Sequence, residues 1–197
     1  MKAFFAILIF SLSTISSYTQ ELRDTSSHLT FKGVPIDGTL DEFVLKMKKG
    51  GFEHLESKNG YAILKGDFAS YKGCSVGVST LKTKDLVSKI VVLFQEQDTW
   101  STLFGNYDNL KNLLTEKYGK PSEVIEKFQS AYEPEDDKSR MHAVMFDRCK
   151  YITTFESGKG AIQLSIEHES VIKCFVKLAY YDKINSEKIK KQALDDL

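Results

Sequence analysis

The sequence predicts an α+β fold with a mainly antiparallel sheet, built from two helix-plus-meander halves and closed by a short C-terminal helix. Two segments have the spacing of apolar residues typical of amphipathic helices, and a block of short alternating segments follows each. Turn signals such as Lys58-Asn59-Gly60 and Ser157-Gly158-Lys159-Gly160 separate the alternating segments. We expect the halves to span residues 20–97 and 98–197, either as one continuous domain or as two small sheets side by side.

The first 19 residues have the pattern of a secretory signal peptide. Lys2 supplies a positive charge, segment 3–12 is almost wholly apolar, and small or polar residues precede a cleavage site before Gln20. The apolar segment is about half the ~20 residues that a spanning helix needs. No cysteine precedes Cys74, so no lipid anchor is expected. The sequence thus predicts a periplasmic or secreted protein with no membrane insertion after cleavage.

The charge balance bears on the kind of partner, and the cysteine content bears on whether a disulfide forms. The chain has 27 basic and 27 acidic residues, which argues against nucleic acid or anionic lipid as the default partner. Its three cysteines are Cys74, Cys149 and Cys174. We expect small buried hydrophobic side chains rather than a disulfide. If a bond forms, Cys149 with Cys174 is the preferred pair, because both lie in the strand-rich second half.

The first helix is expected from Leu40 to Lys49, followed by Gly50-Gly51. Its apolar face contains Leu40, Phe43, Val44 and Met47. The preceding VPIDGTLDE combines an Asp37-Gly38 turn with a capping box from Thr39 to Glu42. DGTL is similar to the nucleophile loop of haloacid-dehalogenase-like phosphatases, but Pro35 occupies the nucleophile position and cannot attack phosphorus. A calcium loop fails because Lys48 stands where a bidentate Glu is needed.

The remaining elements follow in order along the chain. The first block of strands is expected at about 52–57, 60–69, 73–81 and 87–96, with Ile90 to Phe94 as a central strand covered on each side. A second helix runs from about Asp98 to Tyr118, with a possible break at Gly105, and ends at Gly119-Lys120-Pro121. The second block is expected at about 122–132, 140–147, 150–157, 160–168 and 171–182.

The C-terminal helix is expected to begin at a cap formed by Asn185 or Ser186. Ile184 and Ile189 have the spacing of a hydrophobic staple. Ala193, Leu194 and Leu197 would continue the same apolar face.

The two helix starts have related patterns, Gly38-x-x-Asp41-x-Phe43 and Gly105-x-x-Asp108-x-Leu110, which suggests a tandem repeat. The element order resembles the beta-lactamase inhibitor protein fold. The chain is also similar to small exported Bacteroidetes proteins, in which a FKGVPIDGTLDEF-like opening and a LKNLLTEKYGKP-like helix end recur. Covering residues 29–182, the resemblance implies a fold and an exported location. It implies no activity and transfers no functional residue.

No catalytic, cofactor or metal motif stands out. Histidines 28, 54, 142 and 168 lack zinc-ligand spacing, and Glu167-His168-Glu169 is expected to be a solvated strand end. The acidic stretch Glu133-Pro134-Glu135-Asp136-Asp137-Lys138 is expected to be a solvated hairpin tip. We therefore predict no cofactor and no metal.

Aromatic residues give the more useful indication of function. Phe175 and Tyr181 alternate with the core positions of their strand and share its other face with Lys173 and Lys177. Aromatic and basic residues together are typical of recognition surfaces. Alternatively, the rings cover a second apolar cluster or pack on the C-terminal helix.

The sequence predicts a non-catalytic binding module for a protein or envelope component that it does not name. A small-ligand carrier is one alternative, with an apolar pocket of roughly 300 Å³ or more. An enzyme with a site assembled around Cys149, His142 or His168 is another, and it requires hydrogen-bond contact between a nucleophile and a histidine or acid.

Overall fold

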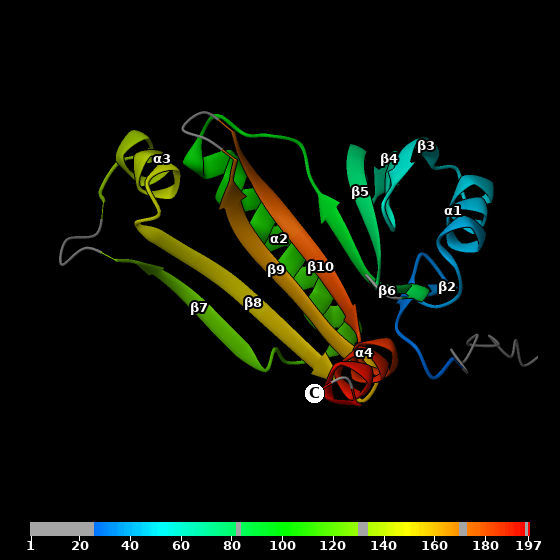
Figure 1. Ribbon diagram of the computed structural model, residues 1–197. Coiled ribbons are helices and arrows are strands. Elements are labelled where there is room, and N and C mark those ends of the chain that lie inside the picture. The colour runs from blue at the N-terminus through cyan, green and yellow to red at the C-terminus, as the bar shows by residue number, and fades with distance from the viewer. Residues whose placement is uncertain (1–25, 82–83, 130–133, 170–172, 196) are drawn as a thin grey trace, which may run out of the picture.

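The computed structural model describes residues 26–197 except 82–83, 130–133, 170–172 and 196. The predicted signal peptide lies outside the described residues. The chain forms an eight-stranded antiparallel sheet, a small two-stranded sheet and four described helices (Figure 1). The predicted α+β class, with a mainly antiparallel sheet and a short C-terminal helix, is confirmed.

Helices α1 and α2 each precede a group of strands. The first half consists of β1 (Thr30–Phe31), β2 (Val34–Pro35), α1 (Leu40–Lys49), β3 (Glu53–Lys58), β4 (Tyr61–Phe68), β5 (Tyr71–Leu81) and β6 (Lys84–Leu93). The second consists of α2 (Trp100–Tyr118), β7 (Glu123–Phe128), α3 (Asp137–Met145), β8 (Cys149–Ser157), β9 (Gly160–His168), β10 (Cys174–Asp182) and α4 (Lys183–Asp195). The strands of the large sheet lie in the order β3-β4-β5-β6-β10-β9-β8-β7. Pairing of β6 with β10 therefore joins the two halves in one sheet.

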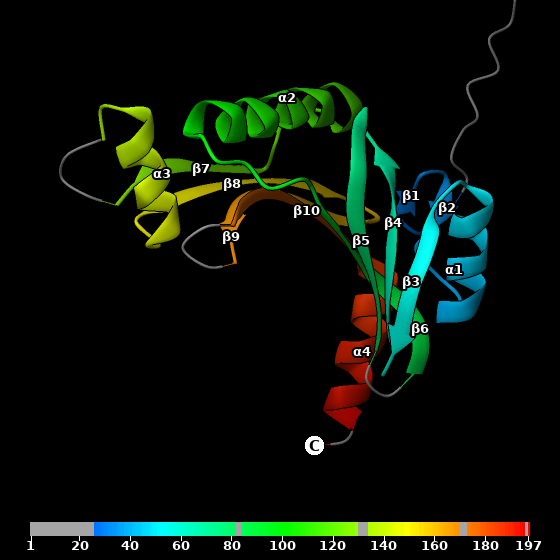
Figure 2. The same cartoon turned by 90° about the horizontal axis from the view of Figure 1, so that it is seen from above.

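Helices α1 and α2 pack on the same face of this sheet. The cross-strand register aligns Leu64, Val76, Val92, Leu178 and Leu164, all buried in a single core cluster. The buried faces of α1 and α2 belong to the same cluster. In Figure 1, α2 lies behind β9 and β10, and Figure 2 shows it along one side of these strands. One continuous core thus spans both halves.

The start of α1 confirms the interpretation of VPIDGTLDE as a turn and cap. Gly38 has a φ of 83°, a value that glycine adopts without steric cost. The Thr39 amide donates to Glu42 at 3.2 Å, and the Glu42 amide donates to the Thr39 hydroxyl at 3.3 Å. The amide of Leu40 also donates to the Asp85 carboxylate at 2.9 Å, which ties the helix start to β6.

The structure corrects the predicted strand at 140–147, which is the helix α3. The side chains of Met141 and Val144 are buried at helical spacing. The segment is short and largely apolar, so its periodicity does not distinguish a helix from a strand. The hairpin β1–β2 was not predicted, and α2 continues through Gly105 without a break.

The acidic stretch before α3 is more than a solvated tip. Asp136 caps α3 by accepting from the Ser139 amide at 2.7 Å. Asp137 accepts from the amides of Trp100 and Ser101 at 3.0 and 2.7 Å, so it caps the start of α2 from a distant part of the chain. Glu133 lies outside the described residues.

The predicted cap of α4 is also wrong. The helix begins at Lys183, and the Asp182 carboxylate accepts from the Asn185 amide at 2.9 Å. Leu194 is 60% exposed and Leu197 is fully exposed, so the expected apolar face does not continue to the end of the chain. The side chain of Ile189, and with it the predicted staple, lies outside the described residues.

Candidate binding face of the sheet

We call the second face of the sheet, opposite α1 and α2, the uncovered face. Three rows of side chains cross it. The first row is Lys65, Ser75, Leu93, Lys177, Ser165, Ile152 and Ile125. The second is Ile63, Gly77, Val91, Ala179, Gln163, Thr154 and Glu123. The third is Tyr61, Ser79, Lys89, Tyr181, Ala161 and Glu156. These rows cross both halves of the molecule.

Apolar side chains on this face are partly exposed, except Ala179, which is fully buried. Val91, Leu93 and Phe175 have intermediate exposure, and among the described residues they lie outside the core cluster. The prediction that Ile90 to Phe94 is covered on each side is therefore wrong for Val91 and Leu93. Small residues such as Gly77 and Ala179 occupy the centre of the second row, between larger side chains. The face thus offers an apolar strip with small residues at its centre.

The four residues predicted as a binding site lie on or next to this face. Phe175, Lys177 and Tyr181 alternate along β10 with the buried core residues. Lys173 directly precedes the strand and is exposed. The expectation that they share the non-core side of one strand is consistent with the register, whereas their role in binding stays a prediction.

Each predicted lysine already has an acidic neighbour. Lys177 Nζ lies 2.5 Å from Glu167 Oε1, which also accepts from the Ser165 hydroxyl at 2.8 Å. Lys173 Nζ lies 3.3 Å from Glu96 and 3.9 Å from Glu169. The charges of Lys173 and Lys177 are therefore compensated locally.

Tyr61 is a candidate binding residue that sequence reasoning missed. It is 41% exposed, and its hydroxyl lies over Gly77, where an added Cβ would be only 2.2 Å from the oxygen. Burial and, secondly, the Glu56 carboxylate raise the pKa of Tyr61. At the far side of the same row, Lys89 Nζ lies 5.0 Å from the centre of the Tyr181 ring. Only the strand register could have brought Tyr61 and Tyr181 into one row.

A pocket of about 330 Å³ lies where the uncovered face meets α4. Glu156, Ala161 and Tyr181 line it from the sheet, and Lys183 and Ser186 line it from the helix. Tyr181 is thus both a member of the third row and a wall of this pocket. The pocket has polar and apolar walls, which suits a polypeptide side chain better than a purely apolar ligand.

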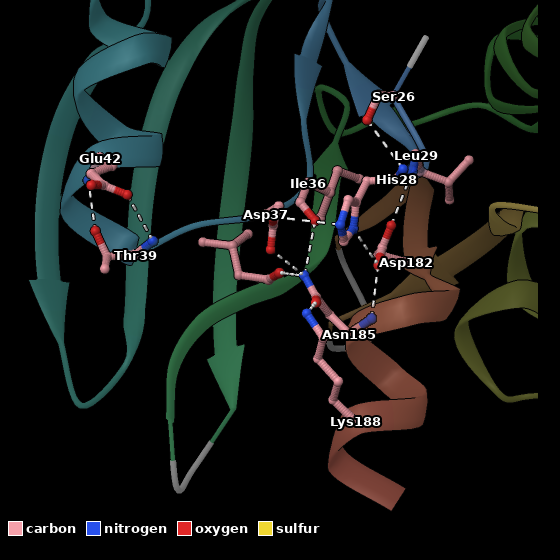
Figure 3. Close-up of polar contacts among 11 residues, drawn as sticks. Ser26, His28, Leu29, Ile36, Asp37, Thr39, Glu42, Asp182, Asn185 and Lys188 are labelled. Carbon is pink, nitrogen blue, oxygen red and sulfur yellow. Dashed lines mark hydrogen bonds and ion pairs between the residues drawn. The ribbon is translucent and has the colours of Figure 1, made fainter. Parts of the chain in front are cut away.

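Buried hydrogen bonds hold α4 beside this pocket (Figure 3). The Asn185 side-chain amide donates to the carbonyls of Val87 and Ile36 at 2.8 and 3.2 Å and to the Asp37 carboxylate at 3.0 Å. Partial burial acts to raise the pKa of Asp37, but hydrogen bonds from Asn185 and the Gly38 amide lower it overall. The VPIDGT segment therefore anchors the C-terminal helix as well as starting α1.

A buried carboxylate fixes the same junction from the other side. Asp182 is fully buried, and its oxygens accept from the Leu29 and Asn185 amides at 3.0 and 2.9 Å. His28 Nδ1 lies 3.0 Å from the same carboxylate, and its Nε2 lies 3.5 Å from Asp37. Figure 3 shows these side chains converging on the start of α4. The network is satisfied by the chain itself, which favours a structural role.

The cysteines do not form the arrangement that the enzyme alternative requires. All three are free thiols, and within the described part of the chain none forms a hydrogen bond with a histidine. Burial and, secondly, the neighbouring Cys174 raise the pKa of Cys149 to about 12. The nucleophilic thiolate is therefore scarce at neutral pH. His168 instead contacts Asp147, with Nε2 3.0 Å from the carboxylate.

The conditional pairing of Cys149 with Cys174 also meets a geometric obstacle. β9 lies between β8 and β10, so one strand separates the two residues. Two strand spacings amount to about 9–10 Å, whereas a disulfide rarely joins Cα atoms more than about 7 Å apart. Both side chains are free in the structure.

One pocket among the described residues has the mainly apolar lining that the carrier alternative requires, but it is small. This pocket, of about 230 Å³, lies between the C-terminal part of α2 and β10 and includes Leu110, Leu114 and Leu178. Its volume is below the roughly 300 Å³ typical of ligand sites.

The described residues contain no group of three or more His, Cys, Asp or Glu side chains suited to holding a metal ion. None of the described helices combines the length and apolar character needed to cross a membrane.

Comparisons with protein-family models, curated proteins and solved structures found no match for this chain. The resemblance to the beta-lactamase inhibitor protein fold and the tandem relationship of the halves therefore stay predictions. The candidate site rests on the geometry of this molecule alone.

Proposed function

We propose that the protein is an exported, non-catalytic binding module that recognises a protein or envelope component through its uncovered face. The observation that carries this proposal is the one-sided packing of the sheet. Helices α1 and α2 pack on the core face, and α4 borders the other face, where partly exposed apolar and charged side chains form continuous rows. An antiparallel sheet commonly leaves one face in water, so it is the partly exposed apolar side chains on this face, such as Val91, Leu93 and Phe175, that support a binding role.

The composition of the uncovered face suits a polypeptide partner. Phe175, Tyr61 and Tyr181 supply rings of the type that dominate binding energy at protein interfaces. Lys177 with Glu167 and Lys173 with Glu96 supply charges at the margin that can exchange local partners for those of a ligand. The balanced charges argue against nucleic acid, which would favour an uncompensated basic surface.

The export part of the proposal rests on the sequence of residues 1–19 and on its resemblance to exported proteins. Mass spectrometry of the N-terminal peptide of the protein purified from its producing cells tests it, since it also detects the pyroglutamate that an N-terminal Gln20 can form. A mature N-terminus at Gln20 supports cleavage, and an intact Met1 contradicts it.

Affinity capture tests the binding face. The purified protein is immobilised, exposed to envelope and culture-fluid extracts of the producing cells, and the retained proteins are identified by mass spectrometry. The test variant combines Lys173→Glu, Lys177→Glu and Phe175→Ala. We expect one protein to be retained by the wild type and its amount to fall about tenfold or more with the variant, since loss of a central aromatic residue typically costs 2 kcal/mol or more.

A matched control changes the same kinds of residue on the outer surface of α1. Leu45 is 54% exposed there, and Lys46 and Lys48 are exposed beside it. Leu45→Ala with Lys46→Glu and Lys48→Glu changes the net charge equally and leaves the uncovered face intact. Equal loss with both variants, or no specific retention by the wild type, contradicts the proposal.

A further inference from the structure

The outer edge of β7 has the regular backbone geometry needed for pairing with another strand. β7 ends the strand order of the sheet and pairs with β8 through six consecutive residues without a register shift. The opposite edge differs, because the pairing of β3 is interrupted by a bulge between His54 and Glu56. Bulges of this kind protect sheet edges from association. Of the two edges, only β7 is regular over its whole described length.

The backbone geometry shows which groups of β7 point outward. The Gln129 amide donates to the Arg148 carbonyl at 2.8 Å, directly beyond the Phe128–Cys149 pair. Antiparallel strands alternate between residues that exchange hydrogen bonds and residues that do not. Glu123, Ile125 and Lys127 therefore bond to β8. The amides and carbonyls of Val124, Glu126 and Phe128 point away from the sheet, where no described strand pairs with them.

The side chains of β7 complement a second copy of the same strand. Antiparallel pairing about a two-fold axis through Ile125 places Glu123 of each copy opposite Lys127 of the other. The interface then contains two such Glu–Lys pairs. The same register pairs Val124 with Glu126, both of which have outward backbone groups. Val124 is 48% exposed in the isolated chain and would be partly covered. A single register thus satisfies the backbone and the charges together.

A like-charge pair within the chain favours the same arrangement. Lys127 lies directly opposite Lys150 of β8, and neither forms an ion pair within the described residues. Like charges facing each other across two strands are unfavourable. Glu123 likewise has no ion pair among the described residues. The second copy would bring its Glu123 to Lys127 and reduce this repulsion.

We infer that two copies of the chain associate by antiparallel pairing of their β7 strands about Ile125. The two-fold axis is perpendicular to the sheet, so the uncovered faces of both copies lie on the same side of one continuous sheet. Strand pairing of this length covers little area compared with a standard interface, so the dimer is expected to form at high protein concentration. The inference does not depend on what the uncovered face binds.

Sedimentation equilibrium of the purified protein from about 1 µM to about 1 mM tests the inference. We expect the mass to rise towards two chains at the upper end. Val124→Pro removes an outward amide without removing a bond to β8, and we expect it to remain monomeric. Val124→Ala keeps the amide and serves as the matched control, which should still associate. Circular dichroism establishes that both variants are folded.

Charge exchange provides a second test that leaves the backbone unchanged. Lys127→Glu and Glu123→Lys each place like charges opposite one another and should weaken association. The double variant restores opposite charges in the same register and should recover it. A wild type that stays monomeric throughout the range overturns the inference. So does a dimer that survives Val124→Pro, or a double variant that associates no better than the single ones.

Discussion

At the residue scale, a few buried polar side chains fix the junction between the N-terminal segment and α4. Asn185 and Asp182 are both fully buried, and their partners come from segments about 100 to 150 residues away in the chain. Sequence reasoning identified Asn185 only as a possible helix cap. Its main partners are the carbonyls of Ile36 and Val87, which no local pattern could reveal.

We expect Asn185→Ala to lower the free energy of unfolding by about 2–3 kcal/mol, because it leaves the buried carbonyls of Ile36 and Val87 without their donor. Chemical denaturation measures the change. Lys188→Ala is the control, since within the described part of the chain Lys188 donates only to Asn185 Oδ1, at 3.2 Å, and the residue is exposed. A similar loss of unfolding free energy in both variants would show that the buried Asn185 amide contributes no more to stability than the exposed Lys188.

Thr154 on the uncovered face gives a prediction of opposite sign. Its hydroxyl oxygen is buried without a hydrogen-bond partner among the described residues. Because an unsatisfied buried hydroxyl is destabilising, we expect Thr154→Val, which keeps the branched shape, to raise the free energy of unfolding by about 1 kcal/mol. Thermal unfolding followed by circular dichroism provides the measurement. A lower melting temperature would mean that the hydroxyl contributes a favourable contact.

At the element scale, turns and caps determine how the strands meet the helices. The turn between β8 and β9 makes a close contact of this kind. Its Gly160 has a φ of 148° and lies against the backbone of β10. A Cβ at this position would be 2.1 Å from the Tyr181 carbonyl oxygen. The glycine therefore allows the β8–β9 turn to approach the end of β10 and the pocket beside α4.

Two glycine substitutions should thus have opposite effects. We expect Gly160→Ala to cost about 3 kcal/mol of stability, through backbone overlap and an unfavourable φ. Gly105 lies within α2 and has nothing within 4 Å of an added Cβ. Gly105→Ala should therefore stabilise the protein by about 0.5–1 kcal/mol. Urea denaturation of both variants checks this, and a stable Gly160→Ala would contradict the described turn.

The cap of α2 predicts a pH dependence. Hydrogen bonds from the Ser101 side chain and then its amide lower the pKa of Asp137. A lowered native pKa means that the carboxylate contributes stability above its unfolded pKa of about 3.9 and loses it as pH falls through the native value. We expect Asp137→Asn to melt below the wild type at pH 7, with the difference shrinking below about pH 3. A difference independent of pH would show that charge is not involved.

These elements also show what the sequence could reveal. Thr39 and Glu42 are local to the helix they cap, so the sequence predicted the start of α1 correctly. Asp137 caps α2 from 36 residues away, and Met141 and Val144 occur in a segment too short for its period to decide between helix and strand. Local interactions were predictable, whereas distant caps and a short helix were not.

At the scale of the whole molecule, the proposed function depends on the two faces of one sheet. The alternation of Ile162, Leu164 and Ile166, and of Val176, Leu178 and Tyr180, correctly identified the core side of two strands. It also placed Phe175, Lys177 and Tyr181 on the other side. The order of the strands was not predictable in the same way, because pairing of β6 with β10 brings together segments about 90 residues apart. Tyr61 was missed for that reason.

The binding of a partner to the uncovered face is the central claim, and site-specific photo-crosslinking tests it most directly. A photoreactive phenylalanine analogue replaces Phe175 in one preparation and Leu45, on the outer surface of α1, in another. Each is irradiated in the producing cells, and adducts are identified by mass spectrometry. We predict a discrete adduct with one envelope or secreted protein from position 175 and none from position 45. No adduct at position 175, or the same adducts at both positions, would contradict the claim.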